Sequence, residues 1–259
     1  MGGYLRLRQL CLVAHELEPA IADLGGIFGL DICYRDGNVA KYGLVNALLP
    51  IGQCFLEVVA PTREGTAAGR YLERRQGDGG YMVIIDCDDI ERRRRHVNEL
   101  GVRIANPLSH ETYTGLQLHP RDTGGCMLEL NHTSGGASLD GPYLPAGPRW
   151  QAFIRTDVTT ALLGAVLQSP EPEQLAARWA RILECPVTHG AAGEPRIALD
   201  LGVLRFVAQA DRRGEGLAGI DLAVADRGWI VAQAERRGCV VANDSVTVCG
   251  TRFGLATMP

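Results

Sequence analysis

The sequence contains no long apolar run. None of its apolar stretches approaches the ~18 residues that a helix needs to cross a membrane. The first ten residues, MGGYLRLRQL, also lack the apolar centre and the small-residue cleavage site of a signal peptide. Apolar residues nevertheless make up 46% of the 259 residues and charged residues 22%, which is the balance of a globular chain with a sizeable core. We therefore expect a cytoplasmic protein with no membrane partner.

Lysine is almost absent. Lys41 is the single lysine against 25 arginines, so a reaction through a lysine Schiff base has only one candidate residue and is not expected. The formal net charge of −4 argues against nucleic acid as a partner, because such proteins usually carry a basic surface. The composition therefore points to a small molecule as the partner.

Cysteine pairs with metal-binding or redox spacing are also missing. The chain has eight cysteines, and no two of them form a CxxC pair. Most lie within apolar stretches, as expected for buried reduced thiols that pack as small apolar side chains. We therefore predict neither disulfides nor a zinc site of the cysteine type.

Periodicity and turn residues arrange the chain into repeated βαβββ units. In the first unit we predict a helix that starts near His15, and strands at residues 5–14, 31–34, 42–49 and 53–60. The second unit has strands at residues 81–87 and 102–105, a helix at 88–100, and two strands on either side of the loop HPRDTGG. Two further units are predicted after residue 150.

An internal repeat supports this division. The stretch from Asp89 to Asn106 aligns without gaps with the stretch from Asp226 to Asn243, at an offset of 137 positions. Residues 133–149 are rich in Gly, Pro and Ser and are predicted as a linker. We therefore predict an α+β protein with two tandem domains at residues 1–132 and 150–259.

Three polar residues interrupt apolar strands in the first half: Gln9, Glu57 and Glu129. A buried carboxylate needs a partner, because an unpaired buried charge is very costly. Two carboxylates and an amide oxygen could ligate a divalent metal, and the carboxylates could instead act as a base and an acid. Each residue could also face solvent on the polar side of an alternating strand, and the pattern alone leaves these alternatives open.

The polar residues do not recur in the second half. Glu57 aligns with Arg205, Glu129 roughly with Ala256, and Gln9 falls opposite Gly164. If the first half holds a site, the second half has lost it, and we predict a structural or lid role for residues 150–259.

Three stretches carry a resemblance to a known family. They are FLEVVAP at residues 55–61, the helix from Asp88-Asp89-Ile90 to Leu100-Gly101-Val102, and LHPRDTGGCMLEL at residues 118–130. These stretches resemble the vicinal oxygen chelate superfamily, with residues 5–131 most similar to the methylmalonyl-CoA epimerases. The resemblance implies four βαβββ units paired into two tandem glyoxalase-like half-barrel domains, with the site in the first.

The resemblance also implies the site residues. The metal positions of the family fall on Gln9, Glu57, Met82 and Glu129, and Asn46 stands where the epimerases have a general-base glutamate. Met82 replaces a histidine, and a thioether is a poor ligand for Co, Mn, Ni or Zn. An amide at position 46 cannot take the α-proton of a thioester. The implied metal ligands are therefore Gln9, Glu57 and Glu129. Two alternatives stay open, a site that binds a divalent metal and a site without one.

Three roles remain from this comparison. The first is a metal-assisted isomerase or lyase acting on a small acyl compound, including a CoA thioester, or on a carbonyl compound. The second is a metal-free enzyme in which Glu57 or Glu129 is the catalytic base, and the third is a non-catalytic small-molecule binding or resistance protein. Substrate contacts are predicted for Asn46, Met82 and His119, although His119 could instead form only local hydrogen bonds in its turn. A homodimer is a candidate oligomeric state.

Overall fold

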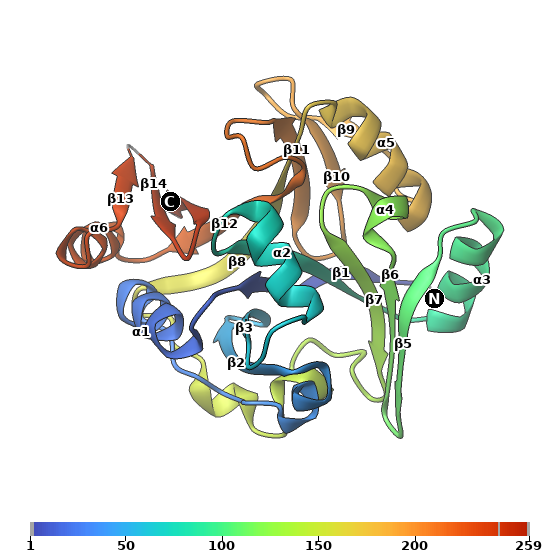
Figure 1. Cartoon of the computed structure of the whole chain (residues 1–259), viewed down its shortest axis with the longest axis horizontal. Helices are drawn as coiled ribbons and strands as arrows, with labels where there is room; N and C mark the ends of the chain where they lie inside the picture. Colours follow the sequence, from blue (N-terminus) through green and yellow to red (C-terminus); the bar gives the residue numbers. More distant parts are fainter. Residues whose placement is uncertain (1–2, 243, 258–259) are drawn as a thin grey trace. The chain divides into compact units, whose positions relative to one another are not determined.

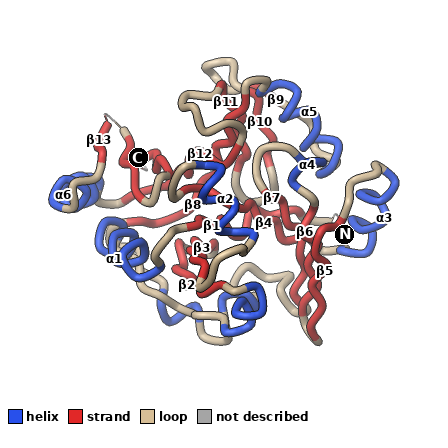
Figure 2. Tube along the Cα trace, in the orientation of Figure 1, coloured by secondary structure: helices blue, strands red, loops and turns tan. Residues whose placement is uncertain are grey.

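The computed structural model describes residues 3–242 and 244–257, so Asn243, at the end of the predicted repeat, lies outside the described residues. The strands form two mixed sheets, and helices alternate with the strands along the chain (Figure 2). The order in the 7-stranded sheet is β2-β3-β1-β4-β7-β6-β5, and in the 8-stranded sheet it is β13-β14-β15-β12-β8-β11-β10-β9. Each sheet takes its strands from one half of the sequence, which confirms the predicted α+β fold with two similar halves.

The strands of the first sheet are β1 (Leu5–Val13), β2 (Leu44–Ile51), β3 (Cys54–Pro61), β4 (Gly79–Cys87), β5 (Ile104–His110), β6 (Tyr113–Leu118) and β7 (Met127–Thr133). The strands of the second sheet are β8 (Thr159–Ser169), β9 (Thr188–His189), β10 (Pro195–Ala198), β11 (Val203–Ala208), β12 (Gly216–Val224), β13 (Val240–Ala242), β14 (Ser245–Val248) and β15 (Thr251–Thr257).

The α-helices are α1 (Leu17–Phe28), α2 (Ala67–Arg75), α3 (Ile90–Glu99), α4 (Pro120–Thr123), α5 (Pro172–Leu183) and α6 (Arg227–Arg236). Three short 3-10 helices complete the described elements: η1 (Gly37–Tyr42), η2 (Leu144–Ala146) and η3 (Trp150–Phe153). None of the described helices is long and apolar enough to cross a membrane.

Contacts divide the chain into two compact units. Unit 1 takes the chain up to Gln9 together with residues 81–144 and 164–217. Unit 2 takes residues 10–80 and 145–163 and the chain from Ala218 onward. Each unit therefore uses segments from both halves of the sequence. The domains at residues 1–132 and 150–259 and the linker between them stay predictions.

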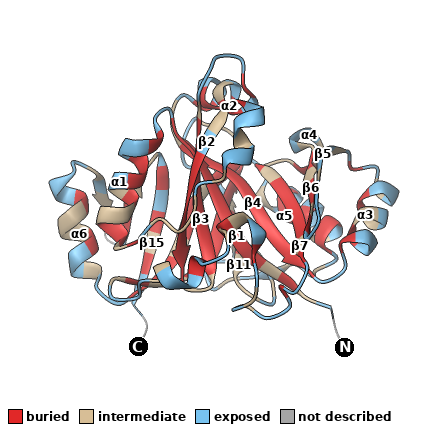
Figure 3. Ribbon diagram, turned by 90° about the horizontal axis from the view of Figure 1, so that it is seen from below, coloured by how far each residue is buried: buried red, intermediate tan, exposed pale blue. Residues whose placement is uncertain are grey.

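Within unit 1, the second βαβββ repeat has the strand arrangement that its helix requires. The first strand, β4, pairs in parallel with the last, β7, and α3 makes the crossover that a parallel pair needs. β5, β6 and β7 then pair in antiparallel order next to it (Figure 1). The apolar strand β4 is buried along its whole length (Figure 3), as expected for a strand covered on both faces.

The internal repeat is confirmed by its helix caps. The carboxylate of Asp89 accepts a hydrogen bond of 2.8 Å from the Arg92 amide at the start of α3. Asp226 does the same at α6, accepting 2.8 Å from the Trp229 amide. Both caps satisfy an amide that has no partner inside the helix, which is why aspartate stands at both positions.

Each unit has an aromatic centre. In unit 1 Trp179 is fully buried, packs edge-on against Phe206 at 6.0 Å, and donates its indole hydrogen to the carbonyl oxygen of Thr123 at 3.1 Å. In unit 2 the rings of Phe28 and Phe253 lie 4.5 Å apart. These contacts anchor α5 and α1 to their sheets.

Some local predictions were wrong. The predicted strand at residues 31–34 is reduced to one isolated bridge, between Tyr34 and Leu48. The following turn is the 3-10 helix η1, whose start is capped by Asp36 through the Asn38 amide at 2.9 Å. The loop HPRDTGG contains the short helix α4, because His119 caps it and Pro120 is preset for a first helical turn.

The cysteines lie in the described part of the chain, and no disulfide joins any of them there. Cys11, Cys54, Cys87 and Cys126 are buried, and the remaining four are half-buried. Burial raises the pKa of the Cys87 thiol to about 12, so this buried side chain stays protonated.

Candidate functional site

Glu129 is the centre of a buried polar network in unit 1. It lies on β7, directly opposite Gln117 on β6, and only 3% of it is exposed. The Gln117 amide nitrogen donates to Glu129 Oε2 at 2.9 Å, and the Tyr113 hydroxyl donates to Glu129 Oε1. Burial, one of the two alternatives that the sequence left open, is therefore what the structure shows, and the acid has the partners that its burial demands.

Gly115 makes the contact between Tyr113 and Glu129 feasible. Tyr113 stands four positions along the β6–β7 ladder from the Gln117–Glu129 pair, and Gly115 and Asn131 form the pair midway between them on the same face. A Cβ atom at Gly115 would lie 3.2 Å from Glu129 Oε1 and 3.1 Å from the Tyr113 ring. The glycine therefore leaves the space through which the tyrosine reaches the carboxylate.

The network continues from Glu129 to Gln9. Asn131 shares the face of Glu129, because it lies two residues further along the same strand. Its amide nitrogen is 3.4 Å from Glu129 Oε1 and 3.3 Å from the Tyr143 hydroxyl oxygen. The Tyr143 hydroxyl in turn donates to Gln9 Oε1 at 3.1 Å. Two of the predicted metal ligands are thus joined through two side chains that the sequence did not single out.

Burial controls the protonation of the network. Desolvation raises the pKa of Glu129, although hydrogen bonds from Tyr113, Gln117 and Asn131 oppose the shift. Desolvation also raises the pKa values of Tyr113 and Tyr143 well above the ordinary value, and the nearby Glu129 carboxylate adds to both shifts. The two phenols therefore stay protonated and act as hydrogen-bond donors. Glu129 is the acid of the network, and its pKa is raised toward neutral pH.

A folded segment brings Tyr143 to this position. Residues 134–143, here called the strap, follow β7 and are fixed by two arginines of β1. Arg6 Nη2 donates to the Ala137 carbonyl oxygen at 2.8 Å, and Arg8 Nη2 donates to that of Leu139 at 2.6 Å. Gly141 closes the strap tightly, since a Cβ there would lie 2.7 Å from the Gly135 carbonyl oxygen.

A second carboxylate, Asp86, lies beside these arginines. It is buried on β4, with Oδ2 at 3.8 Å from Arg6 Nη1. Burial raises its pKa to about 6, and the charges of Arg8, Arg6 and His132 oppose the shift. Asp86 was not among the predicted site residues.

Unit 2 contains the other predicted pair, Glu57 and Asn46. Both are buried, on the antiparallel strands β3 and β2. Asn46 Nδ2 donates to Glu57 Oε1 at 2.7 Å, and Asn46 Oδ1 accepts from the Asp36 amide at 2.8 Å. The Asp36 amide fixes which way the Asn46 side chain points, so its NH2 group is aimed at the carboxylate.

The remaining predicted residues lie outside the network's hydrogen bonds. Met82 is buried on β4 next to Met127 of β7. His119 Nδ1 accepts from the Arg121 amide at 3.2 Å and lies 3.5 Å from an Arg103 nitrogen. Local hydrogen bonding, one of the two alternatives for His119, is therefore what the structure contains, and its contact with a substrate stays a prediction.

The donor set fits a divalent metal poorly. Metal-ligating oxygens must offer lone pairs to the ion, whereas both oxygens of Glu129 and the Gln9 oxygen already accept hydrogen bonds from side chains. Met82 contributes a thioether, which is a poor ligand for Co, Mn, Ni or Zn. Within the described ranges no group of three or more His, Cys, Asp or Glu side chains is arranged to hold a metal ion.

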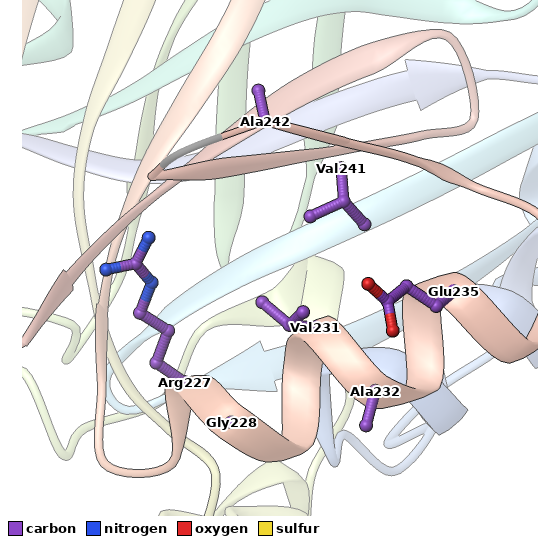
Figure 4. A pocket seen from close by; sticks show the side chains of 7 residues that line it. All are labelled: Arg227, Gly228, Val231, Ala232, Glu235, Val241 and Ala242. Atoms are coloured by element: carbon purple, nitrogen blue, oxygen red, sulfur yellow. The ribbon is translucent and has the colours of Figure 1, made fainter.

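A surface pocket of about 590 Å³ lies in unit 2, apart from these networks. Figure 4 shows it between α6, which contributes Arg227, Val231 and Glu235, and β13, which contributes Val241 and Ala242. Small apolar side chains line its middle, and it contains none of the predicted site residues.

Comparisons with known proteins agree with this architecture. The family profile described as the glyoxalase-like domain matches residues 10–183, which is more than half of the chain. An ethylmalonyl-CoA/methylmalonyl-CoA epimerase from Cereibacter sphaeroides is 25% identical over 131 residues, covering 48% of this chain and 96% of the epimerase. A mitochondrial methylmalonyl-CoA epimerase from Bos taurus is 24% identical over 131 residues, which is 48% of this chain and 73% of that protein.

Solved structures match over nearly the whole chain. A hypothetical protein from Staphylococcus aureus gives a TM-score of 0.68 at 12% identity, covering 98% of this chain and 99% of that one. A mutant 4-hydroxymandelate synthase from Streptomyces coelicolor gives 0.66 at 14% identity, covering 92% and 76%. At these identities the likeness shows the fold alone. The chain belongs to the glyoxalase-like family of the vicinal oxygen chelate superfamily, and its first half is related at low identity to the methylmalonyl-CoA epimerases.

Proposed function

We propose that the chain is an isomerase or lyase that moves a proton on a small acyl or carbonyl compound, with a buried carboxylate as its acid–base group. The observation that supports this proposal is the setting of Glu129. Its carboxylate lies inside an apolar strand and is held by Tyr113 and Gln117, and its pKa is raised. An acid–base catalyst works best when its pKa lies near the working pH, and burial is a common way to raise a glutamate toward that range.

Gln117 gives the proposed site its access. Glu129 and Tyr113 are buried, but Gln117 is half-exposed at its position on β6. A substrate that replaces the Gln117 amide as the partner of Glu129 Oε2 would leave the Tyr113 hydrogen bond in place. The reacting C–H group would then lie next to the carboxylate oxygen that takes its proton.

Glu57 is the second candidate acid–base residue. Asn46 donates to it at 2.7 Å, which orients the carboxylate without supplying or taking a proton. Epimerisation by a pair of bases would need an acid or base at position 46 as well. The amide there favours a reaction with a single basic group, such as an isomerisation or an elimination.

The relatives suggest the substrate class. Two of them are named as epimerases of methylmalonyl-CoA, and in one case also of ethylmalonyl-CoA. Both compounds carry an acidic C–H group next to a thioester carbonyl. A small acyl compound with such a C–H group, including a CoA thioester, is therefore the first class of substrate to test.

The test is exchange of α-hydrogen for deuterium. A panel of acyl-CoA thioesters and small carbonyl compounds is incubated with the protein in D2O and followed by NMR. Glu129→Gln or Glu57→Gln should slow exchange by about 10²- to 10⁴-fold, the usual contribution of one acid–base group, while thermal unfolding stays cooperative. Glu91→Gln, on the exposed face of α3 where Glu91 pairs with Arg94, is the matched control and should keep full activity. Full activity in both buried variants would refute the proposal.

A non-catalytic small-molecule binding protein is the second candidate. It is favoured by the closure of the network, since Glu129 is 3% exposed and both of its oxygens accept hydrogen bonds from side chains. For this role, a compound from the same panel should raise the unfolding temperature without any exchange or turnover.

A further inference from the structure

The Gln9–Glu129 network has a centre that the resemblance did not imply. Gln9 and Glu129 belong to the same unit, and the side chains that join them are Asn131 and Tyr143. Tyr143 is 2% exposed and belongs to the strap. It is more than 130 residues away from Gln9 in the sequence. Its hydroxyl contacts Gln9 Oε1 and Asn131 Nδ2 at 3.1 and 3.3 Å.

We infer that Tyr143 takes the place of a divalent metal in this chain, so that Gln9 and Glu129 act as hydrogen-bond acceptors and not as metal ligands. The inference goes beyond the proposed function, because it concerns metal binding and can be tested without a substrate. It assigns to Tyr143 a positioning role, in which one hydroxyl group fixes the side chains of Gln9 and Asn131.

Hydrogen-bond chemistry carries the first step of the argument. Glu129 Oε1 accepts from Tyr113 and Asn131, and Oε2 accepts from Gln117. A divalent cation would have to approach these oxygens to ~2.0–2.6 Å, and the donor hydrogens already point at the same lone pairs. Binding the ion would therefore leave the buried donors Tyr113 and Asn131 without this acceptor, which is unfavourable.

The position of the Tyr143 hydroxyl carries the second step. Tyr143 is 2% exposed, and its hydroxyl donates to Gln9 Oε1 at 3.1 Å and lies 3.3 Å from Asn131 Nδ2. The hydroxyl therefore supplies a hydrogen-bond donor to the Gln9 oxygen where a metal would supply positive charge.

The strap carries the third step, because it holds Tyr143 in place. Arg6 and Arg8 bind the carbonyl oxygens of Ala137 and Leu139, and the Arg8 guanidinium lies 5.3 Å from the centre of the Tyr143 ring. All three contacts join β1 to the strap. They hold two carbonyl groups of the strap and place the Arg8 guanidinium against the Tyr143 ring.

Met82, another implied metal position, agrees with this assignment. It is buried and pairs with Met127 on β7, and its thioether stands where the resemblance implies a histidine ligand. Thioethers suit soft ions and bind Co, Mn, Ni or Zn weakly. Methionine at position 82 and the hydrogen bonds of Tyr143 therefore both act against binding of a divalent metal.

Metal titration of the full-length protein, purified without an affinity tag or chelator, tests the inference. Co²⁺, Mn²⁺, Ni²⁺ and Zn²⁺ are titrated separately by calorimetry, and the purified protein is assayed for metal content. Surface histidines can bind these ions too, so Glu129→Gln and Gln9→Ala serve as matched controls. We expect the wild type and both variants to bind alike. One equivalent of metal in the wild type that is lost in Glu129→Gln would overturn the inference.

A gain of binding tests the role of Tyr143 separately. The single variant Met82→His introduces an imidazole at the implied ligand position and keeps Tyr143. The double variant Met82→His/Tyr143→Ala introduces the same imidazole and removes the Tyr143 side chain. We expect the double variant to bind Co²⁺ at least about tenfold more tightly than the single variant, which is ~1.4 kcal/mol. Cooperative thermal unfolding shows that each variant is folded. Equal affinities in folded single and double variants would also overturn the inference.

Discussion

Replacing Asp86 by Asn should change the pH dependence of stability. Asp86 is buried on β4, and Arg6 of β1 lies 3.8 Å from its Oδ2. Desolvation raises its pKa from 3.8 to about 6, against the opposing charges of Arg8, Arg6 and His132, with a small raising contribution from Asp88. Burial thus wins over the nearby positive charge.

The sign of the effect follows from the direction of the shift. The folded protein holds the Asp86 proton more tightly than the unfolded chain does. Its contribution to stability is therefore fully present below about pH 3.8 and is lost as the pH rises through about 6. A shift of this size corresponds to about 3 kcal/mol, because each pKa unit is worth about 1.4 kcal/mol. The free energy of unfolding should fall by up to that amount between about pH 4 and about pH 7.

Urea unfolding across that pH range checks the prediction. Asp86→Asn keeps the shape of the side chain but cannot titrate, so the difference between wild type and variant isolates Asp86 from every other group. The constant part of the difference reports lost contacts with the arginines, and only its slope with pH tests the reasoning. Glu91→Gln, which replaces an exposed acid of α3, is the control and should leave the slope unchanged. A difference between wild type and Asp86→Asn that does not vary with pH would refute the reasoning.

Two further pairs of variants test the network and the repeat by urea unfolding. Tyr113→Phe removes a donor to the buried Glu129 and should cost about 1.5–3 kcal/mol, whereas Tyr71→Phe removes a 2.7 Å hydrogen bond to a neutral carbonyl oxygen and should cost about 1 kcal/mol. Equal losses of unfolding free energy in the two variants would mean that the hydrogen bond from Tyr113 to Glu129 is no stronger than one to a neutral acceptor. Asp89→Ala and Asp226→Ala should each cost about 1 kcal/mol, because each removes one helix cap. A loss at one site only would contradict the equivalence of the two repeats.

Features set by local chemistry could be predicted from the sequence. The β4 strand follows from a nearly all-apolar run, and the two capping aspartates follow from a helix start repeated at a fixed offset. Glu129 could be singled out as a buried acid because it interrupts an apolar strand. The roles of Tyr113 and Gln117 as donors to Glu129 were not predicted.

Features set by distant parts of the chain could not be predicted. Tyr143 lies in a Gly-rich stretch without periodicity, and its contact with Gln9 depends on how the strap folds back onto β1. Asn131 could be placed on the face of Glu129, but nothing local says whether it bonds to the carboxylate or to another residue. The strand predicted at residues 31–34 failed for a related reason, since its pairing with β2 is limited to a single bridge.

The composition of the two units has a consequence for how the chain folds during synthesis. Unit 1 needs residues before Gln9 and residues as late as 217, and unit 2 needs residues from 10 onward together with the chain after 218. All strands of the first sheet are present when the first half of the chain has been made, but each unit also includes segments that are synthesised later. Such long-range pairing slows folding, because the entropy of closing long loops is lost before the contacts form. A gene fragment that ends near residue 132 would therefore encode two incomplete units and no finished one.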